Sequence, residues 1–195
     1  MDDYFAVFGL GRRLGLDAEA LQRRFYELSR AHHPDFHQAA PADAQAEALA
    51  TSALVNRAYR ALRDPLARVE YLVALEEGRE TKGGAGRPKA PMELLEEMME
   101  VQEALQRARA AGLEEASRRG LERERRRLLG RRQAEEQAIV DRFADWDRAV
   151  DSGRTKLIEW FKERLATRAY LRTVIDDLEE ALGEAKETHG SHRRH

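Results

Sequence analysis

All five prolines of this chain lie before Met92, and none interrupts the sequence from there to Lys186. Proline ends helices more strongly than any other residue, because its ring locks the backbone and removes a hydrogen-bond donor. Within this stretch apolar residues recur at helical spacing, as at Ile139, Phe143 and Trp146. The C-terminal half of the chain is therefore expected to be helical.

Short connections divide this proline-free stretch into three predicted helices, over 92–110, 113–150 and 154–186. Helices that are joined by short loops run antiparallel to each other. The stretch thus predicts an up-down-up three-helix bundle. Gly120 and Gly130 are the weak points of its middle helix, because glycine costs about 1 kcal/mol there relative to alanine.

The N-terminal part is predicted to form a helical hairpin. Asp17 is a suitable N-cap for an amphipathic helix over 18–32, because its carboxylate can accept from free backbone N–H groups. Pro34 ends this helix, and a second helix is expected over 42–63 after a polar loop. The dipeptide Asp64-Pro65 ends the second helix and begins a short third one.

Residues 77–91 are rich in glycine and proline and contain no large apolar side chain, which is typical of a linker. We therefore predict an N-terminal domain over 1–76, a linker over 77–91, a bundle over 92–187 and a disordered tail over 188–195. No segment shows the alternation that is typical of strands. The predicted fold class is all-α: a helical hairpin with flanking short helices, followed by an antiparallel three-helix bundle.

Composition excludes several classes of function. The chain has no cysteine, so it forms no disulfide and offers no thiolate nucleophile or cysteine metal ligand. Its formal charge is −2 at pH 7, so no global field draws it to nucleic acid or to an anionic membrane. No apolar run is longer than the five residues from Tyr71 to Leu75, far fewer than the roughly 20 residues of a transmembrane helix. No signal-peptide pattern follows Met1, and a cytoplasmic protein is expected.

The tripeptide His33-Pro34-Asp35 lies at the tip of the predicted hairpin. Proline fixes its own backbone and biases His33 away from the helical conformation, so the imidazole and the carboxylate are held on a turn. Such a corner can act as a rigid polar contact for a partner protein. It can also be a plain helix stop before the loop that any helical hairpin needs.

The residues around this corner resemble the J domain of DnaJ-type co-chaperones. The pattern Phe25-x-x-Leu28-Ser29-Arg30-x-x-His33-Pro34-Asp35 is similar to the second helix and loop of the family. Residues 55–65 (VNRAYRALRDP) are similar to its third helix and exit. Three further segments resemble the HscB branch of the family, which acts in iron–sulfur cluster assembly. They are Tyr4-Phe5-x-x-Phe8-Gly9-Leu10, Leu16-Asp17 and Pro65-x-x-Arg68-x-x-Tyr71-Leu72.

The resemblance implies a co-chaperone that is not itself an enzyme and has no catalytic residue. In the family, the loop and second helix dock on the ATPase domain of a DnaK/HscA-class chaperone and stimulate ATP hydrolysis, so the chemistry belongs to the partner. The implied chaperone-binding residues are His33, Pro34, Asp35, Arg23, Arg24 and Arg30. The position after the tripeptide is basic in many J domains and is Phe36 here.

The arginines of the first long helix are placed to meet a partner. Arg23 and Arg30 are seven residues apart and lie on the helix face opposite the apolar positions, with Arg24 at the margin. This face could meet an acidic protein surface. The alternative is that these are ordinary solvated arginines, and Glu27 interrupts the basic patch.

Residues 92–105 carry two apolar stripes. Four residues form the first stripe: Leu94, Met98, Val101 and Leu105. Three residues form the second, offset by roughly 100°: Met92, Leu95 and Met99. One helix of a three-helix bundle seldom buries both stripes, and an exposed apolar patch often marks a protein-binding surface. The linker or the N-terminal domain could instead cover the second stripe.

This helix also resembles the scaffold-binding helix of the HscB family. The resemblance implies a contact with an IscU-type iron–sulfur scaffold protein through Leu94, Leu95, Met98, Met99, Gln102 and Tyr170. Charged positions of the family pattern fall on Met99, Gln102 and Val101 here. A general J-domain adaptor that binds a different client is the alternative function.

The histidine-rich corner raises a third hypothesis, a metal-dependent hydrolase. His32, His33, Asp35 and His37 could imitate a metal site. Metal ligands need converging geometry, which a proline-stiffened loop does not guarantee. No set of carboxylates is placed to support such an enzyme. Neither a metal nor a cofactor is expected.

The segment 118–132 is rich in arginine, which by itself suggests nucleic-acid binding. In the predicted antiparallel hairpin, five glutamates of the preceding helix face this segment: Glu93, Glu96, Glu97, Glu100 and Glu103. We therefore expect ion pairs between the two helices in place of a nucleic-acid site. Each exposed pair contributes only about 0–1 kcal/mol, but together they favour one helix register.

Overall fold

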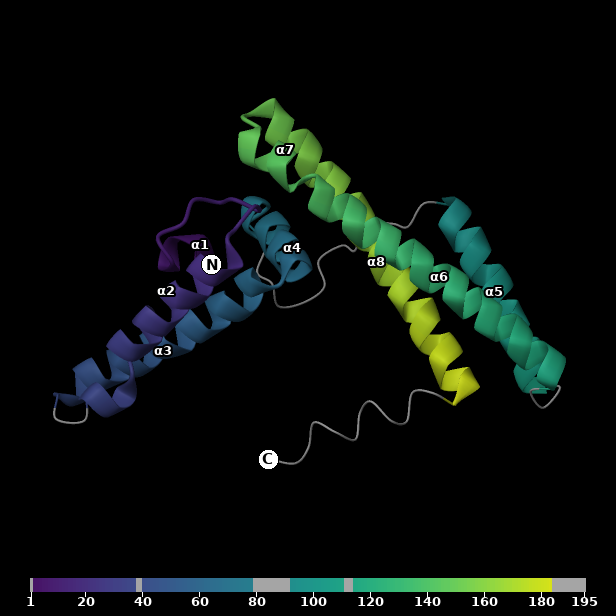
Figure 1. Ribbon diagram of the computed structural model, residues 1–195, viewed down its shortest axis with the longest axis horizontal. Helices are drawn as coiled ribbons and strands as arrows, with labels where there is room; N and C mark the ends of the chain where they lie inside the picture. The colour runs from purple at the N-terminus through teal and green to yellow at the C-terminus, as the bar shows by residue number, and fades with distance from the viewer. Residues whose placement is uncertain (1, 38–39, 79–91, 111–113, 184–195) are drawn as a thin grey trace. The chain divides into compact units, whose positions relative to one another are not determined.

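The computed structural model describes residues 2–37, 40–78, 92–110 and 114–183. All the regular secondary structure in these ranges is helical, and the predicted all-α class is confirmed (Figure 1). Most of the predicted linker, the predicted turn at 111–112 and the predicted tail over 188–195 lie outside the described residues.

The chain divides into two compact units that do not follow the chain order. Met1–Ala85 and Val140–Phe161 form the first unit, and Gly86–Ile139 and Lys162–His195 form the second. Residues 140–161, which the sequence assigns to the bundle domain, thus pack with the N-terminal unit. The domain boundaries drawn from the sequence stay a prediction.

The helices of the first unit begin and end close to the predicted positions. They are α1 (Tyr4–Val7), α2 (Ala18–Ala31), the 3-10 helix η1 (Pro34–His37), α3 (Ala42–Arg63) and α4 (Pro65–Glu76). The carboxylate of Asp17 accepts from the N–H groups of Glu19 and Ala20, which confirms it as the N-cap of α2. Asp64 caps α4 in the same way, and Pro65 occupies the first turn, where its missing N–H costs nothing.

The hairpin of α2 and α3 is closed by aromatic and aliphatic packing. The rings of Phe25 and Tyr59 stack with their centroids 4.1 Å apart, and Val55 and Leu62 of α3 are buried beneath. Phe5 of α1 is also fully buried. These contacts turn one face of α2 toward α3 and leave its opposite face to solvent.

A C-terminal segment completes the first unit. Helix α7 (Phe143–Arg148) lies against the loop between α1 and α2. The carboxylate of Asp147 accepts from the N–H groups of Leu14 and Gly15, at 2.7 and 3.0 Å. On the other side of that loop, the buried guanidinium of Arg68 donates to the carbonyl oxygen of Leu14. The loop is therefore held from two sides by groups distant in sequence.

The second unit contains α5 (Met92–Ala110) and parts of two long helices, α6 (Glu115–Asp141) and α8 (Ser152–Leu182). The three helices enclose one apolar core: Leu94, Met98, Val101, Leu105, Ala108, Leu121, Leu128, Leu171, Val174, Ile175, Leu178 and Leu182. This arrangement confirms the three-helix bundle. Helix α6 continues through Gly120 and Gly130, and the break in the predicted middle helix comes instead at Arg142.

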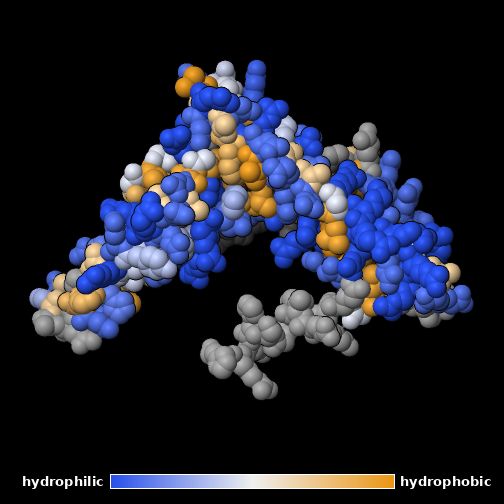
Figure 2. All heavy atoms as spheres, viewed as in Figure 1, coloured by the Kyte–Doolittle hydropathy of each residue, from blue (hydrophilic) through white to orange (hydrophobic). Residues whose placement is uncertain are grey.

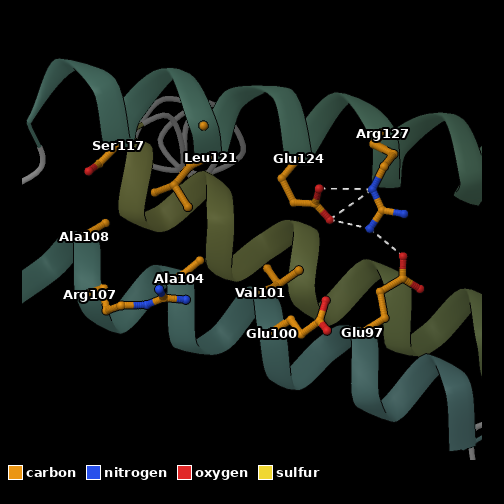
Figure 3. Close-up of a pocket in the computed structure, with 11 residues that line it drawn as sticks. Glu97, Glu100, Val101, Ala104, Arg107, Ala108, Ser117, Leu121, Glu124 and Arg127 are labelled. Carbon is orange, nitrogen blue, oxygen red and sulfur yellow. Dashed lines mark hydrogen bonds and ion pairs between the residues drawn. The ribbon is translucent and has the colours of Figure 1, made fainter.

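Ion pairs join the helices of the second unit, as the arginine-rich segment predicts. Glu97 of α5 pairs with Arg127 of α6, and Arg127 also pairs with Glu124 (Figure 3). Glu97 pairs with Arg131 of α6 as well. Burial raises the pKa of the Glu97 carboxyl, but the hydrogen bonds and charges of the two arginines outweigh it, and the pKa lies below its ordinary value. On α8, Arg164 pairs with Glu135 of α6 at 2.9 Å.

A groove of about 800 Å³ lies between α5 and α6. Figure 3 shows the side chains that line it. Its apolar lining includes Val101, Ala104 and Leu121, and the Glu97–Arg127 pair lies at one end. None of the predicted site residues lines this groove, which lies beside the ion-paired part of the bundle.

Candidate protein-interaction sites

The His-Pro-Asp corner forms a 3-10 turn directly after α2. Helix α2 ends at Ala31, and η1 begins at Pro34. The imidazole Nδ1 of His33 accepts from the N–H of Asp35 at 3.3 Å and lies 3.5 Å from the Asp35 carboxylate. Both side chains are more than half exposed, at 52% and 71%. The corner thus presents an imidazole and a carboxylate to solvent on a short, hydrogen-bonded turn.

The three predicted arginines of α2 are all exposed. Arg23 lies 3.6 Å from Glu19, and Arg24 lies 2.9 Å from Glu27, so both are partly balanced by their own helix. Arg30 occupies the last turn of α2, immediately before the His-Pro-Asp corner. A basic helix end next to an exposed corner suits an acidic protein partner more than a small-molecule substrate.

Two exposed aromatic residues accompany these polar groups. Tyr26 is 61% exposed and Phe36 is 68% exposed. The Phe36 ring lies edge-on to the imidazole of His33, with centroids 6.1 Å apart. Tyr26 belongs to no motif of the sequence. The signal that could have identified it is its place on the α2 face that carries Arg23 and Arg30.

The second candidate site is an apolar groove between α5 and α8 in the second unit. Its volume is about 480 Å³. Five of the six residues predicted to bind a scaffold protein line it: Leu95, Met98, Met99, Gln102 and Tyr170. The Gln102 side chain donates to the carboxylate of Asp177 at 2.7 Å, which holds the amide in place beside the groove.

The two apolar stripes of α5 separate as predicted. Their separation changes the roles expected for Leu94 and Met98. Leu94 is only 1% exposed and lies in the core, outside the groove, while Met98 is 7% exposed and reaches the groove from the core. Met99 is 66% exposed, and Met92 is exposed as well. The accessible apolar surface of α5 is therefore the second stripe, and Leu94 supports it from within.

The described part of the chain shows neither a cluster of metal-ligating side chains nor a membrane-spanning helix. No group of three or more His, Asp or Glu side chains there is placed to hold a metal ion, although the His37 side chain is not described. No described helix is both long enough and apolar enough to cross a membrane. Figure 2 shows mostly hydrophilic residues on the face in view, with hydrophobic residues in separate patches.

Comparison with known proteins points to one family. Residues 90–155 match the family described as the HSCB C-terminal oligomerisation domain. Chaperone HscB from Vibrio cholerae has a similar structure, with a TM-score of 0.63 and 22% identity over 94% of this chain and 99% of that one. Human co-chaperone protein HscB gives a TM-score of 0.63 and 25% identity, over 92% of this chain and 82% of that one. These matches confirm the HscB-type resemblance predicted from the sequence.

Proposed function

We propose that this chain, which is similar to HscB-type co-chaperones, stimulates the ATPase of a DnaK/HscA-class chaperone. It delivers an iron–sulfur scaffold protein of the IscU type to that chaperone, in the cytoplasm. The observation that carries the proposal is the His33-Pro34-Asp35 corner, which is exposed on a turn at the end of a basic helix.

The corner supplies contacts and no chemistry of its own. The Asp35 carboxylate can accept hydrogen bonds from donors of the chaperone, and the His33 imidazole can donate or accept. Proline restricts the backbone between them, so little conformational freedom is lost when the corner docks. Such a pre-organised contact can favour the hydrolysis-competent state of a partner, provided that it binds this state more tightly than the other.

The exposed arginines support a docking surface of defined charge. Arg23, Arg24 and Arg30 lie on the last three turns of α2, next to the corner. Their charge would steer an acidic surface of the chaperone toward the corner and would raise the association rate at low salt. Several arginines of the α6 segment form ion pairs with glutamates, as in Arg127–Glu97 and Arg131–Glu97, which argues against a nucleic-acid function for it.

The groove between α5 and α8 supports the scaffold-binding role. It combines an apolar floor with the amide of Gln102 and the ring of Tyr170. Methionine adapts to the shape of a partner, and Met99 is freely accessible. Burying two or three such side chains contributes several kcal/mol before the cost of association, which suits a transient contact. The alternative is a general J-domain adaptor that binds a different client through the same groove.

Steady-state ATPase assays test the chaperone function. We expect the wild-type chain to stimulate a DnaK/HscA-class ATPase, and Asp35→Asn to abolish the stimulation while leaving the fold unchanged. Asp2→Asn is the matched control, because it removes one exposed aspartate carboxylate of the same unit that lies before α1, whereas the corner packs against α3. If the wild-type chain stimulates no chaperone of this class, the proposal is wrong.

Binding assays with a purified iron–sulfur scaffold protein test the second role. Leu95→Ala combined with Met99→Ala should weaken scaffold binding at least tenfold, because the groove loses accessible apolar area. Val150→Ala, an exposed apolar residue of the first unit, is the control. Equal binding by the double variant and the wild type would favour the general adaptor with another client.

A further inference from the structure

We infer that Tyr26 and Phe36 are apolar anchors of the chaperone-docking surface, which this chain uses together with its arginines. The inference rests on the proposed ATPase-stimulating function and adds the chemistry of the surface that the partner must present. That surface combines acidic side chains with apolar recesses that receive the two rings.

The two aromatic side chains extend the polar docking face. Tyr26 lies one helical turn from both Arg23 and Arg30, and these positions share one face of α2. Phe36 follows the corner and packs its ring edge against the His33 imidazole. Cationic and aromatic side chains therefore alternate from the middle of α2 to η1.

The exposure of these rings is not explained by the packing of the hairpin itself. Phe25, the neighbour of Tyr26, stacks on Tyr59 and closes the contact of α2 with α3. The hydroxyl of Tyr26 accepts from the side-chain amide of Gln22 at 3.1 Å, on the exposed side of the helix. Large apolar side chains at this exposure leave hydrophobic area in water that a partner can cover. Tyrosine and arginine are also the residues that most often dominate interface energy.

The charge of this α2 face favours one class of partner surface. The neighbouring cations, Arg23 and Arg30, favour an acidic surface, and the exposed rings of Tyr26 and Phe36 add apolar area to the same face. An ionic contact weakens steeply with salt, whereas an apolar contact does not. The surface therefore predicts chaperone docking that retains much of its affinity at high ionic strength.

Binding of purified DnaK/HscA-class chaperone in its ATP state to immobilised full-length chain tests the inference. The wild type is compared with Tyr26→Ala, Phe36→Ala, Phe36→Lys and Arg30→Ala over a range of salt concentrations. Leu49→Ala on α3 is the matched control, because Leu49 is as exposed as Tyr26 but lies on another helix. Circular dichroism checks that each variant keeps its helical fold.

We expect Tyr26→Ala and Phe36→Ala each to weaken binding about fivefold to tenfold at every salt concentration, with the salt dependence unchanged. Arg30→Ala should flatten the salt dependence, and Phe36→Lys should make it steeper. Tyr26 makes no ring contact with His33 among the described residues, so its variant separates an apolar anchor from a disturbed corner.

If the wild-type chain binds the chaperone and both aromatic variants bind it with the same affinity, this inference is wrong and the proposed function stands. A wild-type chain that does not bind the chaperone would overturn both. A loss of affinity in Leu49→Ala equal to that in Tyr26→Ala would also overturn it, because the effect would then be nonspecific.

Discussion

The indole Nε1–H of Trp146 donates to the carbonyl oxygen of Arg12 at 2.8 Å, although 134 positions separate the two residues. Trp146 is completely buried, and the guanidinium of Arg154 covers its ring. With the neighbouring Asp147 contacts, this bond ties the loop between α1 and α2 to α7. The unit that carries the His-Pro-Asp corner therefore depends on residues beyond position 139 for its own packing.

Asp147→Ala should destabilise the first unit. The substitution leaves the N–H groups of Leu14 and Gly15 without their acceptor, and a lost hydrogen bond to a charged group costs about 1.5–3 kcal/mol. Urea denaturation would measure the decrease in the free energy of unfolding. Asp145→Ala is the control, because Asp145 pairs with Arg142 and Arg148 on the surface, and we expect little change. Equal effects of the two substitutions would show that the Asp147 contacts with Leu14 and Gly15 do not stabilise the unit.

Gly15→Ala tests the same contact by steric means. A Cβ atom at Gly15 would lie 2.8 Å from a carboxylate oxygen of Asp147, so this carboxylate must shift, which weakens its hydrogen bonds to the loop. We expect a loss of about 1–2 kcal/mol in a thermal or urea melt. At Gly11 a Cβ atom would meet only Arg13 at 3.9 Å, and Gly11→Ala should be tolerated. A neutral Gly15→Ala would mean that the loop is not held as described.

Tyr71→Phe should cost about 1 kcal/mol and should change the response to alkaline pH. The Tyr71 hydroxyl donates to the carbonyl oxygen of Asp2 and accepts the N–H of Tyr4, while its ring stacks on that of Tyr4. The phenylalanine variant keeps the stacking but loses both hydrogen bonds. The measurement is the free energy of unfolding at neutral pH.

Burial raises the pKa of Tyr71 above its ordinary value of 10.0, and this outweighs the Tyr4 hydrogen bond that lowers it. A raised folded-state pKa gives stability that is present below pH 10 and is lost as the pH rises through the folded value. The wild type should therefore lose stability above pH 10 more steeply than Tyr71→Phe. Parallel curves for the two proteins would refute this assignment.

Glu97→Lys should lower the melting temperature of the second unit. It removes the pairs with Arg127 and Arg131 and places a like charge between them. The sequence places five glutamates of α5 opposite the arginine-rich segment, and the described ion pairs with Arg127 and Arg131 involve Glu97. Glu96→Lys is the control and should have the smaller effect. A larger effect of Glu96→Lys would show that the helices pair in another register.

The same carboxylate predicts an acid-sensitive contribution to stability. The folded-state pKa of Glu97 lies below the ordinary value of 4.5, so the contribution is present above that pH and is lost as the pH falls through the folded value. Glu97→Gln should remove this part of the acid response, by about 1 kcal/mol or less. Thermal melts between pH 7 and pH 3 would measure it. An unchanged acid response in the variant would rule out the contribution.

The helices and the exposed corner follow from local chemistry that the sequence displays directly. Asp17 and Asp64 begin helices because a short carboxylate reaches the free N–H groups of the first turn. Pro34 ends α2 and so leaves His33 and Asp35 on an exposed turn. The two stripes of α5 also separate by helical geometry alone. These features depend on neighbours within a few positions, which sequence reasoning can use.

Tertiary packing decided the rest, because it depends on groups that meet only after folding. Nothing near Asp147 in the sequence indicates that it accepts from Leu14 and Gly15, or that residues 140–161 join the first unit. The division of α5 into buried Leu94 and exposed Met99 needed the positions of α6 and α8. A chain of amphipathic helices determines which faces are apolar, but only the packed structure determines which partner covers each face and which face stays in water.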